Sequence, residues 1–203
     1  MRKTALLAVM SGFFFLTCLA QAQQGDAMFG FGTITSPGAA ECQASNNSLE
    51  GVVCPEKGGL YTNISADVIF HKRVGIGFDA AWRASQGDFA GSGQPYRPIL
   101  FDFNGVYQPR ISKKIGADLM GGIGWQTTRF YLPYCTNGFT CNNYNSTNHF
   151  LVDIGGGIRY YVWGHVFVRP EVRYYHILNN TDVYTSNNVV HVGASIGYTI
   201  GPD

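Results

Sequence analysis

The feature that most constrains the fold of this chain is a two-residue alternation of apolar side chains with small or charged ones. Along residues 74–83, one face carries Val74, Ile76, Phe78, Ala80 and Trp82, while the other carries only Gly, Asp, Ala and Arg. This period is typical of a β-strand with one apolar side. It recurs along the chain and predicts eight strands, near residues 27–34, 58–71, 74–85, 97–109, 114–131, 147–162, 166–178 and 188–200.

The connections between these strands alternate in length. Three are short, at residues 72–73, 110–113 and 163–165, and four are long, at 35–57, 86–96, 132–146 and 179–187. If neighbouring strands are antiparallel, every short turn lies at one end and every long loop at the other. We expect the first strand to be short, because residues 28–33 are rich in glycine. We also expect a bulge at Pro170, which cannot donate to a ladder.

Two architectures use such strands: a soluble sandwich, whose apolar faces form a core, and a transmembrane barrel, whose apolar faces contact lipid. Sandwich strands are typically five or six residues long, whereas a tilted membrane strand needs about 9 to 11. Several of the predicted strands are longer than ten residues. Length therefore favours an all-β fold, an eight-stranded antiparallel up-and-down transmembrane β-barrel.

Aromatic residues on the apolar faces collect near both ends of the strands, as in the two interfacial girdles of a membrane barrel. From Phe150 to Tyr160, the strand spans roughly 33 Å, which a tilt of about 40° reduces to around 25 Å. That height matches the apolar band of an outer-membrane barrel. The predicted girdle residues are Phe70, Tyr107, Tyr160 and Tyr198 near the short turns, and Trp82, Phe101, Trp125, Phe150 and Tyr174 near the long loops.

The opposite faces of the strands carry charges and glycines. An eight-stranded barrel is only wide enough for its side chains to fill the interior. Opposite charges can pair there, and glycines leave room for long arginines, so we expect an ion-paired polar core without a continuous pore. In a sandwich, the same charges would be solvated surface. The predicted lumen residues are Asp67, Asp79, Arg83, Asp102, Asp118, Asp153, Arg159, Arg169, Glu171 and Arg173.

The first 22 residues have the organisation of a secretory signal peptide. Arg2 and Lys3 precede an apolar stretch, and Ala20-Gln21-Ala22 fits the small-x-small cleavage site. A membrane anchor and a lipoprotein at Cys18 are the alternatives. Cleavage leaves one domain, residues 23–203, with 12 basic against 13 acidic side chains. A nucleic-acid partner is not expected, because such proteins carry a basic patch or stripe.

Four cysteines remain after cleavage: Cys42, Cys54, Cys135 and Cys141. An even number of cysteines in a secreted chain predicts disulfides. Of the three possible connectivities, Cys42 with Cys54 and Cys135 with Cys141 close the smallest loops. Free thiols are the alternative, and zinc is less expected because the spacings do not fit a structural zinc site. No cofactor or metal is expected.

Several segments carry a family resemblance. The end of the chain, His191-Val192-Gly193-Ala194-Ser195-Ile196-Gly197-Tyr198, resembles the closing strand of bacterial outer-membrane barrels, although five residues follow it. Residues 81–87, 96–98, 101–104 and 161–171 resemble the small outer-membrane β-barrel proteins common in Acidobacteria, which are similar to OmpA-type barrels. The resemblance covers essentially the whole mature chain and carries no catalytic residues.

This resemblance implies a bacterial outer-membrane protein whose long loops are extracellular and whose short turns and mature termini are periplasmic. Its expected partners are outer-membrane lipid, lipopolysaccharide and the barrel assembly machinery. The preferred function is a non-enzymatic structural role in the envelope. A surface-binding or adhesion role is the alternative, because residues 131–144 are rich in Tyr and Asn, which are effective contact residues on displayed loops. The external ligand is unknown.

An enzyme that modifies lipid A is a third hypothesis. His149 and His176 lie near the long-loop end, with Ser146, Asp182 and Ser186 nearby in sequence. No spacing fixes a nucleophile beside a base, so these residues are better explained as polar residues of the rim. His71, His165 and His191 do not form a metal-binding spacing either.

Overall fold

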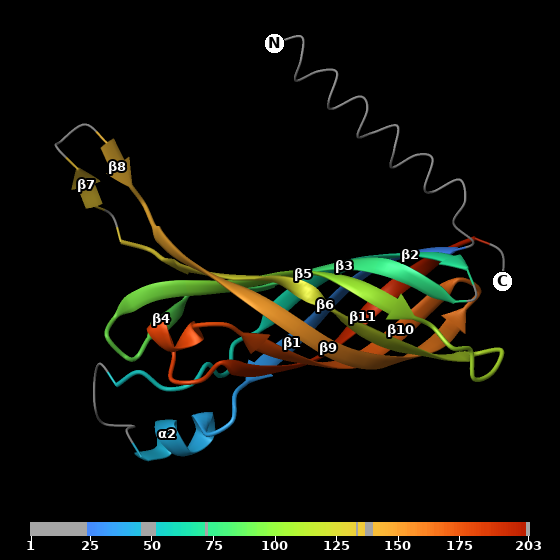
Figure 1. Cartoon of the computed structure of the whole chain (residues 1–203), viewed down its shortest axis with the longest axis horizontal. Coiled ribbons are helices and arrows are strands. Elements are labelled where there is room, and N and C mark those ends of the chain that lie inside the picture. Colours follow the sequence, from blue (N-terminus) through green and yellow to red (C-terminus); the bar gives the residue numbers. More distant parts are fainter. Residues whose placement is uncertain (1–23, 46–51, 72, 133, 137–139, 202–203) are drawn as a thin grey trace, which may run out of the picture.

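The computed structural model describes residues 24–45, 52–71, 73–132, 134–136 and 140–201 and shows a closed antiparallel β-barrel (Figure 1). Strands β1 and β11 pair with each other, as do β3 and β5, and these pairings close the wall. The predicted eight-stranded fold is confirmed. The wall consists of β1 (Gln24–Thr35), β2 (Tyr61–His71), β3 (Val74–Arg83), β5 (Gln94–Tyr107), β6 (Ile115–Phe130), β9 (Asn145–Trp163), β10 (Val166–Ile177) and β11 (Asn188–Ile200).

The long connections lie together at one end of the barrel (Figure 1). They contain the short elements α2 (Ala39–Ser45), β4 (Gly87–Phe89), β7 (Tyr134–Thr136), β8 (Thr140–Asn142) and η1 (Asn180–Asp182). The short turns and both ends of the described chain lie at the other end. We call these two ends the loop end and the turn end. Among the described residues, no helix is long and apolar enough to cross a membrane.

The first strand is longer than the sequence predicted. It runs for 12 residues, and its register with β11 is continuous from Gly25 opposite Ile200 to Thr35 opposite Val190. The glycines that suggested a short strand have a packing role. A Cβ atom on Gly30 would meet the Asn63 side chain, and one on Gly32 would meet the His191 ring. A larger side chain does not fit at either position, because the Asn63 and His191 side chains already occupy that space.

The prediction of a bulge at Pro170 is wrong. Strand β10 keeps one register with β9 on both sides of Pro170, with Val168 opposite Tyr160 and Glu171 opposite Gly157. The irregularity lies instead between Val166 and Phe167, beside the turn. Pro170 occupies an exposed position opposite Ala194 of β11. The wall therefore tolerates the missing amide donor without an extra residue.

The barrel is apolar outside and charged inside. Large apolar side chains on the outer face are exposed, including Phe29 at 49%, Ile76 at 58%, Ile154 at 66% and Ile196 at 63%. A soluble sandwich would bury such a face, so this distribution is the one required of a wall surrounded by lipid. The interior also has apolar layers that the sequence did not predict: Ile69, Val106 and Met120 form one buried cluster, and Ile34, Tyr61, Ala81, Leu100, Leu151, Tyr175, Ile177 and Val189 form another.

Candidate functional site

Arg159 joins four strands across the lumen. It extends inward from β9 and is 2% exposed. Its Nη1 lies 2.5 Å from Asp26 Oδ2 of β1, its Nη2 3.0 Å from Asp67 Oδ2 of β2, and its Nε 2.6 Å from Asp118 Oδ2 of β6. The guanidinium also lies 4.5 Å from the centre of the Phe167 ring. Every nitrogen of this side chain is thus engaged in holding the wall together.

Two further arginines extend inward from β10. Arg169 Nη2 lies 2.7 Å from Glu171 Oε2, and Arg169 Nη1 lies 3.3 Å from Asp118 Oδ2. Arg173 Nη1 lies 3.1 Å from Asp102 Oδ1 of β5, and Arg173 Nη2 contacts Asp79 of β3. Asp118 is shared with Arg159, and Glu171 Oε2 also lies 3.9 Å from Arg173 Nε, so the ion pairs form one continuous network.

Neutral side chains add hydrogen bonds to this network. The Gln108 amide donates to Asp26 and Asp67, at 3.2 Å in each case. The Asn63 amide donates to Glu171 at 3.3 Å, and the Asn104 amide donates to Asp79 at 3.2 Å. Charges buried away from water persist in proteins when they are paired and hydrogen-bonded. The arrangement places a network of paired charges in the middle of the lumen.

Glycines provide the room that the arginines occupy. A Cβ atom on Gly155 would lie 2.7 Å from Arg173 Cγ, and one on Gly157 would lie 3.1 Å from Arg169 Cγ. Both glycines belong to β9, which faces the arginine-bearing strand β10. The spacing of small and long residues on these two strands is therefore complementary.

The structure brings most of the predicted lumen residues together. Asp67, Asp79, Asp102, Asp118, Asp153, Arg159, Arg169, Glu171 and Arg173 are all buried. Arg83 differs, since it is half-buried near the loop end, with its guanidinium 5.2 Å from the centre of the Tyr96 ring. Sequence reasoning missed Asp26, because the predicted first strand began at residue 27. The alternation in β1 does identify it once the strand begins at Gln24.

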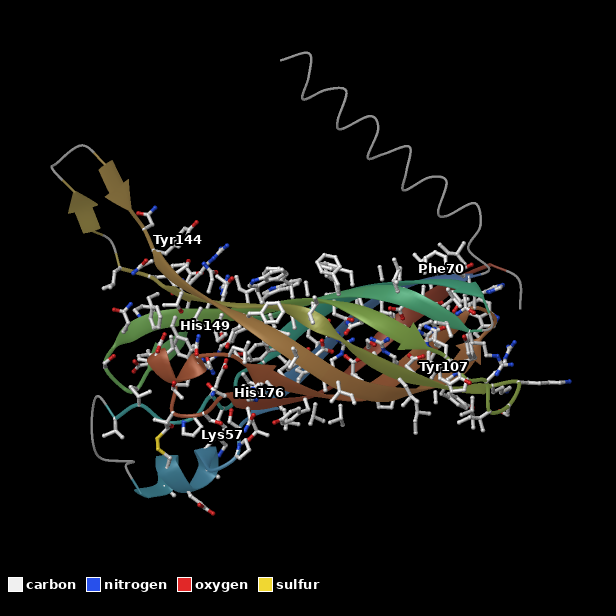
Figure 2. All side chains as sticks on the ribbon, viewed as in Figure 1. Lys57, Phe70, Tyr107, Tyr144, His149 and His176 are labelled. Atoms are coloured by element: carbon white, nitrogen blue, oxygen red, sulfur yellow. A yellow bond between two sulfur atoms is a disulfide. The ribbon has the colours of Figure 1, made fainter. Side chains whose placement is uncertain are left out.

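The predicted girdle residues all occupy outward-facing positions, since each alternates with the inward-facing residues of its strand. Strand register places Phe101 opposite Trp125 and Trp125 opposite Phe150, with ring centres 5.7 and 5.6 Å apart. Tyr107, Tyr160 and Tyr198 lie nearer the turn end. Figure 2 shows Phe70 and Tyr107 at that end, far from Tyr144 at the other.

A segment of the first long loop covers the loop end of the lumen. Glu56 is 3% exposed and accepts hydrogen bonds from Tyr61 Oη at 2.9 Å and from Gln126 Nε2 at 2.7 Å. Burial raises the pKa of the Glu56 carboxyl to about 7, although these hydrogen bonds and the charge of Arg83 offset part of the rise. No sequence pattern pointed to Glu56, because it lies outside every predicted strand.

One of the two predicted disulfides is present in the structure. Cys42 and Cys54 form a disulfide, with their Cα atoms 5.8 Å apart, which joins α2 to the segment that carries Glu56. In the backbone register of β7 and β8, Cys135 lies directly opposite Cys141. Directly opposed residues lie about 4.5 to 5.5 Å apart at Cα, within the range of a disulfide. The second disulfide stays a prediction.

The histidines considered for catalysis do not share a site. On β9, His149 is buried on the inward face, whereas His176 on β10 lies on the outward face between two inward residues. His176 Nδ1 lies 2.8 Å from Asn188 Oδ1, and the Ser186 hydroxyl bonds to the backbone of Asn188. Figure 2 shows both histidines toward the loop end. Among the described residues, no group of three or more His, Cys, Asp or Glu side chains could hold a metal ion.

Comparison with known proteins agrees with this architecture. The family model for the outer membrane protein beta-barrel domain matches residues 5–197. Neisserial surface protein A is similar in structure, with a TM-score of 0.56 at 13% identity over 86% of this chain and 95% of that one. No curated protein sequence matches the chain.

Two further structures show the same fold. The attachment invasion locus protein Ail of Yersinia pestis, in complex with the heparin analogue sucrose octasulfate, has a TM-score of 0.53 at 11% identity over 87% of this chain and 98% of that one. The N-terminal β-barrel domain of Pseudomonas aeruginosa OprF has a TM-score of 0.53 at 11% identity over 89% of this chain and 100% of that one.

Proposed function

The chain belongs to the outer-membrane β-barrel protein family, and on that premise we propose that it is a non-enzymatic structural protein of the bacterial envelope. One observation carries the proposal: Arg159 and Arg173 extend across the lumen and bind carboxylates of the opposite wall, and Arg169 shares Asp118 with Arg159. Such a core leaves no continuous water-filled path and instead ties the strands together. The barrel then acts as a rigid body that occupies the membrane and presents its loops.

The even number of strands places both ends of the described chain at the same end of the barrel. Gly25 lies opposite Ile200, so both ends of the described chain are at the turn end. We propose that residues 1–22 are a removed signal peptide, that the turn end faces the periplasm and that the loops face outward. The apolar outer face contacts lipid and lipopolysaccharide, and the barrel assembly machinery inserts the chain. An epitope tag placed between Asn142 and Asn143 should be accessible to antibody on intact cells.

Conductance tests the filled lumen. The refolded mature protein in planar bilayers should give no conductance above leak, whereas discrete open channels would contradict the proposal. A variant in which Arg159 and Arg173 are both replaced by Ser should conduct more than the parent, because the replacement removes two of the side chains that block the lumen. A matched exposed replacement, Arg110→Ser, should not.

Surface binding through the loops is the second candidate function. The strands β7 and β8 form a hairpin that extends beyond the barrel rim (Figure 1). At its base, the Arg129 guanidinium lies 5.0 Å from the centre of the Tyr144 ring. Ail, a neighbour in fold, is known in complex with a heparin analogue. Deletion of residues 134–142 should abolish binding of heparin or of host surfaces while the barrel still folds, and unchanged binding would make the hairpin a simple connector.

The non-enzymatic assignment has its own test. His149 and His176 face opposite sides of the wall, so a joint acid–base site is not formed. Cells that express the His149→Ala and His176→Ala variants should have the same lipid A mass profile as cells that express the parent. A modified lipid A species that disappears with either variant would contradict the assignment.

A further inference from the structure

Among the described residues, the exposed charged side chains of the short turns are all basic. Arg73, Arg110, Lys113 and Lys114 are exposed there, and the sequence adds Lys72. Residues 72–73, 108–114 and 164–165, which form the short turns, contain no Asp or Glu. In contrast, the long loops carry acidic residues such as Glu41, Asp88 and Asp182. The barrel is thus electrically asymmetric along its axis.

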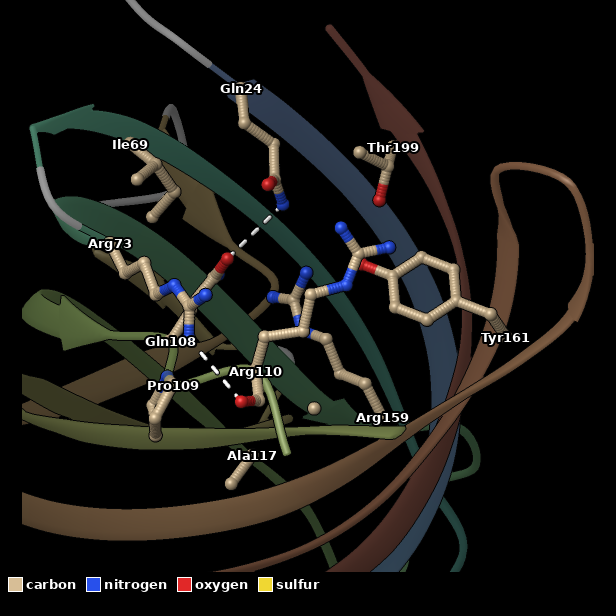
Figure 3. A pocket seen from close by; sticks show the side chains of 11 residues that line it. Gln24, Ile69, Arg73, Gln108, Pro109, Arg110, Ala117, Arg159, Tyr161 and Thr199 are labelled. Carbon is tan, nitrogen blue, oxygen red and sulfur yellow. Dashed lines mark hydrogen bonds between the residues drawn. The ribbon is translucent and has the colours of Figure 1, made fainter. Parts of the chain in front are cut away.

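Within this basic face lies a pocket of about 380 Å³, shown in Figure 3. Arg73 and Arg110 line it together with Gln108 and Tyr161, and no acidic residue is among its lining residues. The volume falls in the range of small-molecule sites and is about ten times that of a water molecule. The pocket can therefore hold more than a single solvated ion.

The two arginines are held in place by contacts between their turns. The backbone N–H of Gln108 donates to the backbone carbonyl of Arg73 at 2.8 Å, and Arg73 Nη1 donates to the backbone carbonyl of Arg110 at 3.3 Å. Both contacts tie the turn after β2 to the turn after β5. Arg110 lies with its guanidinium 5.9 Å from the centre of the Tyr161 ring. The site is thus organised before any ligand arrives.

Arg73 itself has an unusual backbone. Its φ is 72°, in the left-handed region where glycine is the ordinary choice. A non-glycine residue is uncommon in this region. Two-residue hairpin turns require left-handed conformations, so the turn between β2 and β3 accounts for this backbone, and the Arg73 side chain is left to line the pocket.

Arg159 separates the pocket from the carboxylates of the lumen. Arg159 lines the pocket, whereas its partners Asp26, Asp67 and Asp118 do not. The carboxylates are engaged by Arg159, so none competes for the guanidinium groups of Arg73 and Arg110. An anion that enters from the turn end therefore meets two guanidinium groups and no acid.

We propose that this pocket binds a phosphate group, with Arg73 and Arg110 as its ligands. Guanidinium groups match phosphate oxygens through paired N–H donors, and such charge-assisted bonds are stronger than neutral ones. The phosphate can come from free phosphate or from the headgroup of an anionic phospholipid. The lipid source rests on the proposed orientation, in which this face meets the periplasmic leaflet, whereas binding of free phosphate does not.

The test uses mature protein refolded in octyl glucoside, a detergent without phosphate. Calorimetric titration with inorganic phosphate forms one arm, and titration with dihexanoyl phosphatidylglycerol forms the other, each at fixed ionic strength. The variant Arg73→Gly/Arg110→Gln removes both guanidinium groups and keeps a residue suited to the left-handed turn. Lys113→Gln, in the same turn but outside the pocket lining, is the matched control. Heat-modifiable migration verifies that each variant has folded.

The proposal predicts saturable binding in at least one arm. The double variant should weaken it by at least about ten-fold, the factor expected for loss of one charge-assisted hydrogen bond, and the control should change it by less than about two-fold. Saturation by phosphate identifies a free oxyanion, and saturation by the lipid alone identifies a headgroup. No saturable binding, unchanged binding by the double variant, or equal loss in Lys113→Gln would overturn the proposal. A failure of this kind leaves the filled lumen untouched, since conductance tests that separately.

Discussion

At the scale of single residues, the lumen holds more carboxylates than guanidinium groups. Among the described residues, the buried acids are Asp26, Glu56, Asp67, Asp79, Asp102, Asp118, Asp153 and Glu171, against Arg159, Arg169 and Arg173 as the buried arginines. Each arginine therefore serves several acids at once. Replacing a paired group leaves buried charge without compensation, which costs more than the pair itself contributes.

Arg159→Met should accordingly destabilise the barrel. The change keeps the length of the side chain but removes the cation that Asp26, Asp67 and Asp118 share, so that Asp67 and Asp118 keep only their contacts with Arg169, at a cost of about 3 to 5 kcal/mol. Urea unfolding of the refolded protein, followed by tryptophan fluorescence, measures the loss. Arg110→Met, an exposed arginine at the turn end, should change the free energy of unfolding by less than about 0.5 kcal/mol. Equal stability of the two variants would show that the network is dispensable.

Glu56 should make the loop end sensitive to pH. Burial raises the pKa of the Glu56 carboxyl from 4.5 to about 7. Between these pH values, Glu56 keeps its proton while residues 52–60 cover the lumen and releases it when the segment opens to solvent. The closed position of residues 52–60 is therefore most stable below pH 4.5 and loses up to about 3 kcal/mol as pH rises to 7. Hydrogen exchange of this segment across pH 4 to 8 should show the loss.

Glu56→Gln should remove that pH dependence. The neutral amide does not titrate in this pH range. It can also hydrogen-bond to Gln126, because Gln126 Oε1 has no hydrogen-bond partner among the described residues. Lys57→Gln, at the adjacent position, serves as the control and should keep the pH dependence of the parent. If Glu56→Gln follows the parent curve, another group controls the opening.

The sequence identified single residues where the alternation was clear and missed them elsewhere. Asp67, Asp118 and Arg159 occupy regular inward positions within long strands, so the period alone marked them. Asp26 was missed because glycines obscured the start of β1. The burial of Glu56 and the contact between the two turns at Arg73 depend on segments that are far apart in the sequence. A local pattern cannot predict such contacts.

At the scale of elements, β9 and β10 fit each other through glycine opposite arginine. Gly155→Ala should destabilise the barrel by about 1 to 3 kcal/mol, because its Cβ would lie 2.7 Å from Arg173 Cγ in a packed interior. Gly121→Ala is the control, since its Cβ on the outer face would meet only Asp153 O at 3.5 Å. Urea midpoints of the two variants provide the comparison. A more stable Gly155→Ala variant would mean that the interior has spare room.

The cysteines of the loops should all be oxidised in protein from the bacterial envelope. Mass spectrometry of unreduced protein should find two disulfides, Cys42 with Cys54 and Cys135 with Cys141. In the Cys42→Ser/Cys54→Ser variant, protease should cut residues 36–60 faster, while the barrel strands stay protected, because the crosslink constrains the loop alone. Free thiols at Cys135 and Cys141 would contradict the second pairing.

Strand positions were predicted well because every strand has one apolar and one polar face. The period of two is local, so β3, β6 and β11 could be placed within a few residues. The elements of the loops could not. Strands β4, β7 and β8 are three residues long, and α2 covers seven, so none is long enough to show a period. The prediction of a bulge at Pro170 was wrong because it came from the general rule that proline disrupts strand pairing. That rule does not say how a particular barrel wall accommodates a missing backbone N–H.

At the scale of the whole molecule, the barrel is an apolar cylinder with a charged interior and unequal ends. The outer face suits lipid, and the interior is joined by three buried arginines. The basic turn end and the mixed-charge loop end give the two sides of the membrane different surfaces. These features fit the proposed scaffold role of the wall, with recognition left to the ends.

The measurement that most directly tests a closed, membrane-embedded barrel is migration in SDS electrophoresis. Residues 23–203, refolded in detergent micelles, should migrate differently before and after boiling and should give a β-type far-UV circular dichroism spectrum. A chain that instead folds without detergent as a soluble β monomer, with the same migration boiled and unboiled, would contradict the account.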